Sequence, residues 1–262
     1  MPATDLPLLI EAAHAAGREA SVFVGPLAVS WEKPENAGPV TEADIAVNEL
    51  LISKLRAARP DYGWLSEETE DSAERLSKDT IFIVDPIDGT RSFVAGSRTW
   101  AISIAIAQQG RITAAVVFLP LRNKMYAAGL GIGTTLNGKT VKVAKAIPRQ
   151  TAKVLATSTN LETQNWPGGL PLLDRHYRPS LAYRLSLVSE GRFDGMITLR
   201  ASWEWDIAAG ALLVTEAGGH VTDRTGIPLH FNNKEPMLNG VLAATKPLHL
   251  DLITRLSATD PR

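Results

Sequence analysis

The sequence contains no cysteine among its 262 residues. Disulfide bonds, thiolate metal sites and a cysteine nucleophile are therefore excluded. Charge of one sign is not in excess either, because 27 lysines and arginines stand against 28 aspartates and glutamates, a net charge of −1. A chain without a basic field is not expected to bind nucleic acid.

No targeting signal or membrane span is apparent at the start of the sequence. Residues 1–20 carry Asp5, Glu11, Arg18 and Glu19 among apolar residues, which fits neither a signal peptide nor a membrane-spanning helix. The lack of cysteine is compatible with a reducing compartment. We therefore expect a soluble, cytoplasmic protein with no membrane partner.

Several familiar catalytic patterns are missing as well. The five histidines do not show the spacing of a histidine-based zinc site. The glycines around residue 130 are not accompanied by the Lys-Ser/Thr of a P-loop, and no Ser-His-Asp set is apparent. The chemistry must therefore be carried by other residues, above all by carboxylates.

The composition is that of an ordered globular protein. Apolar residues make up 45% and charged residues 21% of the chain, which argues against disorder. We expect a single domain over residues 1–262, since this length suffices for one large layered core. A subdomain boundary is expected near 146–151, around Pro148, between an N-terminal α+β part (1–148) and a C-terminal α/β part (149–262).

Apolar periodicity predicts helices and strands along the whole chain. Helices are predicted over 6–24, from Thr41 to just before Pro60, and over 182–190, 207–217 and 248–256. Strands are predicted over 61–65, 80–84, 100–107, 112–119, 124–128, 141–144, 153–157, 193–199, 220–222 and 240–244. Residues 26–39 are predicted to be a loop, and 129–138 a hairpin or loop. The successive strands after residue 100 indicate an antiparallel meander.

The stretch Asp85-Pro86-Ile87-Asp88-Gly89-Thr90 follows a buried strand and carries two carboxylates three residues apart. Pro86 favours an extended conformation at Asp85, so both side chains could face one small volume. Two crowded anions repel each other unless a cation neutralises them, and carboxylate oxygens suit Mg2+ or Mn2+. Gly89 and Thr90 then offer N–H groups to a phosphate at a probable helix start. The alternative is an ordinary Asp-rich turn.

Other carboxylates lie where an apolar element meets a turn or helix start. Asp44 is the third helical residue after the N-cap Thr41, and Asp206 begins a helix, so each could serve as a capping residue. Glu67 and Glu68 are adjacent, and we expect at most one of them to face the volume between Asp85 and Asp88. Taken together, such carboxylates could hold divalent ions that clamp a phosphate ester.

The sequence resembles the inositol monophosphatase family, part of a wider superfamily of Mg2+-dependent, lithium-sensitive phosphatases. The resemblance is carried by Val40-Thr41-Glu42-Ala43-Asp44, Glu67-Glu68, Asp85-Pro86-Ile87-Asp88-Gly89-Thr90, Trp205-Asp206-Ile207-Ala208-Ala209-Gly210 and Glu216-Ala217-Gly218-Gly219. It implies an α+β fold, a layered αβαβα sandwich of the inositol monophosphatase and fructose-1,6-bisphosphatase type, usually a homodimer. It also implies hydrolysis of a small phosphorylated metabolite by direct attack of a metal-activated water.

The resemblance also implies roles for individual residues. Two or three Mg2+ ions, or Mn2+ in their place, would be bound by Glu67, Asp85, the Ile87 carbonyl, Asp88 and Asp206. Asp44 and Thr90 would be catalytic and would orient and deprotonate the attacking water. Substrate would contact Gly89, Thr90, Ser180 and Asp206. Lys33, which matches a lysine of the family's metal-site loop, is a further candidate, together with Glu68, Arg184 and Arg200.

Two departures from the family pattern concern the substrate. The family carries a glutamate several residues before the Trp-Asp motif, where this sequence has Ile197-Thr198-Leu199-Arg200. The family's Gly-Ser/Thr segment is here Pro179-Ser180, which removes one amide donor. Inositol 1-phosphate is the first candidate substrate. The alternatives are a 3'(2'),5'-bisphosphate nucleotidase, in which Arg184 or Arg200 would meet a second phosphate, a histidinol-phosphate phosphatase, and a regulatory binding protein on the same fold.

Overall fold

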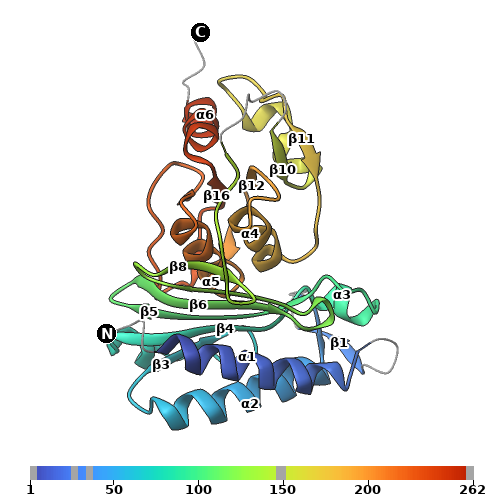
Figure 1. The fold of residues 1–262 in the computed structure, drawn as a ribbon, viewed down its shortest axis with the longest axis vertical. Coiled ribbons are helices and arrows are strands. Elements are labelled where there is room, and N and C mark those ends of the chain that lie inside the picture. The colour runs from blue at the N-terminus through green and yellow to red at the C-terminus, as the bar shows by residue number, and fades with distance from the viewer. Residues whose placement is uncertain (1–4, 25–28, 34–37, 146–151, 258–262) are drawn as a thin grey trace.

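The computed structural model describes residues 5–24, 29–33, 38–145 and 152–257, which form five alternating layers (Figure 1). Helices α1 (Leu6–Ser21) and α2 (Glu42–Ala58) cover one face of a seven-stranded sheet. Helices α4 (Leu181–Ser189) and α5 (Glu204–Glu216) lie between this sheet and a five-stranded sheet, and α6 (Lys246–Ser257) covers the outer face of the second sheet. The predicted αβαβα sandwich is confirmed.

The seven-stranded sheet has its strands in chain order, from β3 to β9. They are β3 (Gly63–Ser66), β4 (Thr80–Asp88), β5 (Ala101–Gln108), β6 (Arg111–Leu119), β7 (Lys124–Gly129), β8 (Gly133–Leu136) and β9 (Lys139–Val141). Only β3 and β4 are parallel, so the predicted meander is confirmed. The edge strand begins earlier than predicted, because Asn137 and Gly138 adopt positive φ and form a two-residue turn that pairs Leu136 with Lys139.

Both faces of the long sheet are buried, which explains the continuous apolar run in β4. Phe82 and Val84 pack in the core cluster of α1 and α2, whereas Ile81 and Ile83 pack in the cluster of α4 and α5. Side chains alternate across a strand, so successive residues serve different cores. The layer of α4 and α5 is therefore fixed against the strand that carries the Asp85 and Asp88 motif.

The second sheet has the order β11-β10-β12-β16-β14. Its strands are β10 (Lys153–Leu155), β11 (Asp174–His176), β12 (Gly195–Thr198), β14 (His220–Thr222) and β16 (Val241–Ala244). Val241 and Ala243 face α4 and α5, while Leu242 and Ala244 pack with α6. The predicted subdomain boundary at 146–151 lies outside the described residues.

Short elements complete the chain. They are α3 (Thr90–Val94), β1 (Ser30–Glu32), β2 (Pro39–Thr41), β13 (Ser202–Trp203), β15 (Met237–Leu238) and the 3-10 helices η3 (Ala73–Ser77), η4 (Pro120–Arg122), η6 (Ser158–Leu161) and η7 (Thr163–Asn165). The prediction of a loop over 26–39 was wrong for residues 30–32 and for Pro39, because β1 pairs antiparallel with β2. Three residues give too short an alternation to be recognised in the sequence.

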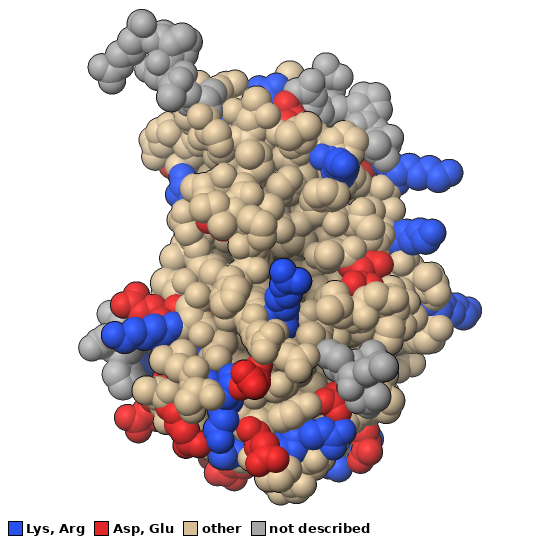
Figure 2. All heavy atoms as spheres, turned by 90° about the vertical axis from the view of Figure 1, so that its left-hand side faces the viewer, with Lys and Arg blue, Asp and Glu red and all other residues tan. Residues whose placement is uncertain are grey.

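Charged side chains are mixed on the face of the molecule shown in Figure 2, where acidic and basic groups are interspersed rather than gathered by sign. This distribution agrees with the near-neutral net charge. Within the described ranges, no helix combines the length and the apolar character needed to cross a membrane.

Candidate active site

The end of β4 is irregular at the motif that carries two of the carboxylates. Asp85 pairs with Ser103 and Asp88 with Ala101 on β5, so one additional residue is accommodated between them as a bulge. Pro86 has no N–H to donate to the ladder and is tolerated at such a position. The Ile87 N–H turns back to Asp85 Oδ1 at 3.0 Å. The bulge thus aims Asp85 while keeping it 1% exposed.

Glu67, Asp85 and Asp206 bring their carboxylates together. One oxygen of each lies within 4.8 Å of those of the other two. Glu67 follows β3, Asp85 lies on β4, and Asp206 lies in the first turn of α5. These three distant acids thus face one volume, and their role as metal ligands stays a prediction.

Of the three carboxylates, Glu67 forms an ion pair with Lys33, whereas Asp85 is poorly compensated by the described residues. Asp85 Oδ2 is buried and has no hydrogen-bond partner among them. Burial, then the charges of Glu67, Asp88 and Asp206, raises the pKa of Asp85 well above its usual value. Burial also raises the pKa of Asp206, followed by the charges of Asp88 and Glu67. A buried unpaired carboxylate beside two others is the environment that a divalent cation stabilises.

The donor set fits a hard divalent metal ion. All the converging groups are carboxylate oxygens, with no nitrogen or sulfur donor among them. The unpartnered oxygen of Asp85 is the strongest sign, since buried polar atoms are otherwise nearly always paired. The three-carboxylate group formed by Glu67, Asp85 and Asp206 could therefore hold a metal ion.

Asp88 lies outside the three-carboxylate group and is bound by the start of α4. Its Oδ2 accepts hydrogen bonds from Ser180 Oγ and the Ala182 N–H, both at 2.6 Å. Burial raises the pKa of Asp88 to about 6, although these two donors oppose the rise. Ser180 also accepts from the Tyr183 N–H as the N-cap of α4. Asp88 therefore joins α4 to the end of β4.

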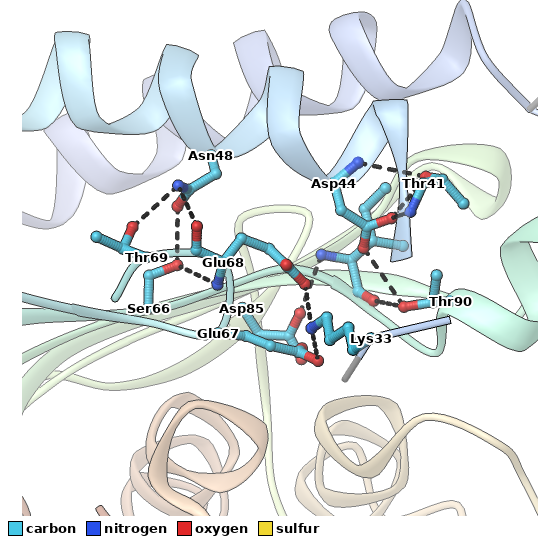
Figure 3. A network of polar contacts seen from close by, with 11 residues as sticks. Lys33, Thr41, Asp44, Asn48, Ser66, Glu67, Glu68, Thr69, Asp85 and Thr90 are labelled. Atoms are coloured by element: carbon cyan, nitrogen blue, oxygen red, sulfur yellow. Dashed lines mark hydrogen bonds and ion pairs between the residues drawn. The ribbon is translucent and has the colours of Figure 1, made fainter. Parts of the chain in front are cut away.

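Asp44 lies in the first turn of α2, and Thr90, the first residue of α3, lies beside it (Figure 3). Asp44 Oδ2 accepts from the Thr41 N–H at 2.8 Å and from Thr41 Oγ1 at 2.5 Å, and the predicted capping box is confirmed. Thr90 Oγ1 lies 3.4 Å from Asp44 Oδ1 and 3.2 Å from the Ile87 carbonyl. Burial raises the pKa of Asp44 to about 6, against the effect of the Thr41 hydrogen bonds.

Lys33 bridges the two adjacent glutamates. Its Nζ lies 2.8 Å from Glu67 Oε1 and 2.6 Å from Glu68 Oε1 (Figure 3). Only Glu67 belongs to the three-carboxylate group, in line with the expected divergence of neighbouring side chains. Both nevertheless reach one ammonium, because glutamate side chains are long. Burial raises the pKa of Glu68 to about 7, which Lys33 opposes.

Gly89 and Thr90 begin α3, where the sequence predicts a phosphate contact. Gly89 is the N-cap residue with φ of +99°, a conformation that favours glycine. Asp206, in contrast, is not the N-cap of α5. Trp203 occupies that position and the helix begins at Glu204, so Asp206 is the third helical residue. The N-cap alternative for Asp206 was wrong, which removes the simplest capping explanation for its presence.

Two arginines adjoin the substrate side of the site. Arg184 is 5% exposed, donates to the Arg178 and Pro179 carbonyls, and lies 4.7 Å from the Tyr177 ring centroid. Arg200 is exposed and follows β12. Its guanidinium has no hydrogen-bond or ion-pair partner within the described part of the chain, yet its charge influences the pKa of both Asp206 and Arg184.

Sequence reasoning missed several residues that support the site. Asn48 on α2 donates to the Glu68 carbonyl and accepts from Ser66 Oγ, and Ser103 on β5 donates to the Trp205 carbonyl (Figure 3 shows the first two contacts). Ser103 is a single polar residue within the apolar run of β5, and Asn48 shares the buried face of α2 with Asp44; a polar residue among apolar ones is the signal that could have indicated them.

Comparisons with known proteins give one consistent result. The profile of the inositol monophosphatase family matches residues 5–259. The inositol-1-monophosphatase of Mesorhizobium japonicum is 34% identical over 254 residues, covering 84% of this chain and 86% of the relative. The Nus factor SuhB of Escherichia coli K12 is 32% identical over 252 residues, with 92% and 91% covered.

Solved structures agree with the sequence comparisons. The extragenic suppressor protein suhB of Bartonella henselae superimposes with a TM-score of 0.80 at 27% identity, covering 97% of this chain and 98% of that one. The Thermotoga maritima IMPase gives a TM-score of 0.81 at 25% identity, with 98% and 97% covered.

Proposed function

The chain belongs to the inositol monophosphatase family and is a metal-dependent phosphomonoesterase, and on that premise we propose that inositol 1-phosphate is its substrate. The three-carboxylate group with the unpartnered Asp85 oxygen supports the metal-dependent chemistry, and the similarity to two inositol-1-monophosphatases supports the choice of substrate. Mg2+ is the proposed ion, two or three per site, with Mn2+ as a substitute and lithium as an inhibitor. A homodimer in the cytoplasm is proposed as the working form.

Glu67, Asp85 and Asp206 would hold the metal, with Asp88 and the Ile87 carbonyl as further ligands. When bound, the metal supplies charge neutralisation for the phosphate and a lowered pKa for water. The N–H groups of Gly89 and Thr90 at the start of α3 would hold phosphate oxygens.

The proton of the attacking water would be accepted by Asp44 through Thr90. The Thr90 hydroxyl lies within reach of Asp44 Oδ1, and a base with a raised pKa of about 6 suits proton transfer near neutrality. Thr41 holds the Asp44 carboxylate in place from the other side.

A substrate panel tests this proposal. We expect Mg2+-dependent release of phosphate from inositol 1-phosphate, compared with adenosine 3',5'-bisphosphate and histidinol phosphate, and no release after chelation. Asp88→Asn is the matched inactive control, since its amide oxygen can still accept from Ser180 and Ala182 and keep the fold. Absence of Mg2+-dependent turnover with every substrate would favour a regulatory binding protein instead.

A second candidate, a 3'(2'),5'-bisphosphate nucleotidase, is favoured by Arg184 and Arg200. The exposed guanidinium of Arg200, which has no partner among the described residues, influences Asp206 in the region where the family pattern has an acid, and a second phosphate would pair with it. In that case Arg200→Ala should raise KM for the bisphosphate about 10-fold or more and leave inositol 1-phosphate hydrolysis unchanged. Equal effects on both substrates would exclude this specificity.

A further inference from the structure

A continuous series of hydrogen bonds joins the segment after β3 to the first residue of α5. Arg75 in η3 is 2% exposed and binds Asp71 through two contacts of 2.6 and 2.7 Å. Its Nη1 donates to Asn232 Oδ1 at 2.7 Å, and Asn232 Nδ2 returns a bond to the Arg75 carbonyl at 3.2 Å. Arg75 and Asn232 are 157 residues apart in sequence.

The series continues from Asn232 to Glu204. The Asn232 N–H donates to Glu204 Oε2 at 2.7 Å, and Asn233 donates to Glu204 Oε1 through its N–H at 2.9 Å and its amide at 2.7 Å. Glu204 is 0% exposed, so these donors satisfy a fully buried carboxylate. We call Arg75, Asn232 and Glu204 the tether.

One end of the tether lies in the same helical turn as Asp206, and the other packs against the start of the strand that leads to Glu67. Arg75 packs against the first residue of β3, because a Cβ on Gly63 would lie only 3.3 Å from the Arg75 Cα. That strand leads directly to Glu67. Glu204 is the first residue of α5 and Asp206 the third. The tether therefore connects the strand that precedes Glu67 with the helical turn that carries Asp206.

We propose that Arg75, Asn232 and Glu204 are positioning residues that hold Asp206 beside Glu67 before a metal ion arrives. Carboxylates within 4.8 Å of one another repel, so their elements tend to separate while no cation is bound. The strand pairing of β3 with β4 holds Glu67 near Asp85, and Ser103 restrains the Trp205 carbonyl. The tether adds a restraint between the start of β3, the strand that leads to Glu67, and the first turn of α5.

This inference concerns metal affinity. Groups hydrogen-bonded to metal ligands typically change that affinity 10–100-fold, and a restraint on the elements that carry the ligands acts in the same direction, toward the lower end of that range. The inference rests on the proposed function for the metal site itself. It predicts that a broken tether weakens divalent-ion binding, because part of the binding energy must then restore the geometry of the three carboxylates. Turnover at saturating metal should stay near the wild-type value, since no tether residue touches the reacting groups.

Asn232→Gly tests the tether cleanly. Asn232 has φ of +63°, which glycine adopts without strain, so the substitution removes only the two side-chain contacts to Arg75. Asn137→Gly is the matched control. Asn137 has φ of +48° and its side chain also accepts one bond, from the Met125 N–H, and donates one, to the Asn123 carbonyl, in the turn between β8 and β9.

Mn2+ binding to the metal-free full chain, measured by titration calorimetry, is the readout. We expect Asn232→Gly to weaken Mn2+ binding about 10-fold and Asn137→Gly to leave it unchanged, with comparable losses in melting temperature. Asn232→Asp, which keeps the acceptor for Arg75 Nη1, should recover most of the affinity. Glu204→Gln should weaken Mn2+ binding as Asn232→Gly does, because the new NH2 group would face an N–H donor of Asn232 or Asn233 and lose that hydrogen bond.

The outcomes separate this inference from the proposed function. Equal Mn2+ affinities of the two glycine variants would reduce the tether to an ordinary stabilising contact and overturn the inference. A wild-type chain that binds no Mn2+ would instead overturn the metal site on which the proposed function rests.

Discussion

At the scale of single residues, Asp85 has the most unfavourable electrostatic environment of the three-carboxylate group, because it is buried, lies beside other carboxylates and has an oxygen without a partner among the described residues. One of its oxygens accepts from the Ile87 N–H, and the other is buried without a partner among the described residues. A buried unsatisfied polar atom costs about 1–3 kcal/mol, and more when it is charged. Its neighbours Glu67 and Asp206 increase this cost, so the metal-free protein is destabilised at the position that a metal would use.

Asp85→Asn should therefore stabilise the metal-free protein at high pH. The folded-state pKa of Asp85 lies well above its ordinary value of 3.8, so the folded wild type binds more protons than the unfolded chain between those two pKa values. Wild-type stability consequently falls as pH rises through that range. We expect the variant to melt about 2–8 °C higher than wild type at pH 8 and to lose this advantage near pH 4.

The measurement is thermal melting in chelator across pH. Asp223→Asn is the control, since Asp223 Oδ1 already accepts three hydrogen bonds within its own loop. If the melting temperatures of Asp85→Asn and wild type changed with pH in parallel, the ionised Asp85 carboxylate would not be the group that destabilises the metal-free protein.

In the proposed mechanism, Thr90 passes the proton of the attacking water to Asp44. Thr90→Ala should lower kcat about 100-fold while Mn2+ affinity measured by calorimetry stays within twofold of wild type. Thr90→Ser keeps the hydroxyl near Asp44 Oδ1 and the Ile87 carbonyl and should retain most of the activity. An unchanged kcat for the alanine variant would remove Thr90 from the mechanism.

At the scale of elements, the capping box of α2 both stabilises the start of the helix and holds the Asp44 carboxylate in place. Thr41 caps the helix and at the same time hydrogen-bonds the Asp44 carboxylate. Those bonds favour the ionised form of Asp44 against the effect of burial. The stability of the helix start and the basicity of Asp44 are thereby coupled.

Thr41→Ala should lower the free energy of unfolding by about 1 kcal/mol, a fall of about 2–4 °C in melting temperature. It should also raise the pKa of Asp44, because a donor to the ionised form is lost. If Asp44 is the base, the acid limb of kcat/KM then moves to higher pH by about one unit. Thr41→Ser should resemble wild type in both measurements, and an unmoved acid limb in Thr41→Ala would argue against Asp44 as the base.

Most of these elements could be predicted from sequence, because periodicity and capping are local signals. The start of α2 at Thr41 and the meander after Trp100 follow directly from such patterns. The bond from Asp88 to Ser180 could not be predicted, since it joins residues 92 positions apart through tertiary packing. The tether between Arg75 and Glu204 through Asn232 could not be predicted either, because Arg75 and Asn232 are 157 residues apart and also meet through tertiary packing.

At the scale of the whole molecule, the proposed metal site lies where two layers meet. Glu67 directly follows β3 and Asp85 lies on β4 of the seven-stranded sheet, while Asp206 belongs to the helical layer between the two sheets (Figure 1). An ion bound to all three would act as a cross-link between layers. Local sequence shows each acid separately, and only the fold shows that they belong to different layers.

Divalent metal should therefore stabilise the whole fold. A ligand at 100 times its dissociation constant contributes about 2.7 kcal/mol, which corresponds to about 5–10 °C in melting temperature for a chain of this size. We expect this rise with Mg2+ or Mn2+ for wild type and for Asp223→Asn, and its loss in Asp206→Asn. Because Asp206 is the only contribution of the helical layer to the three-carboxylate group within the described residues, its loss should uncouple the layers while Glu67 and Asp85 remain in place. If Asp206→Asn gained as much stability from metal as wild type does, the ion would be held by the sheet alone, and the cross-link between layers would have to be abandoned.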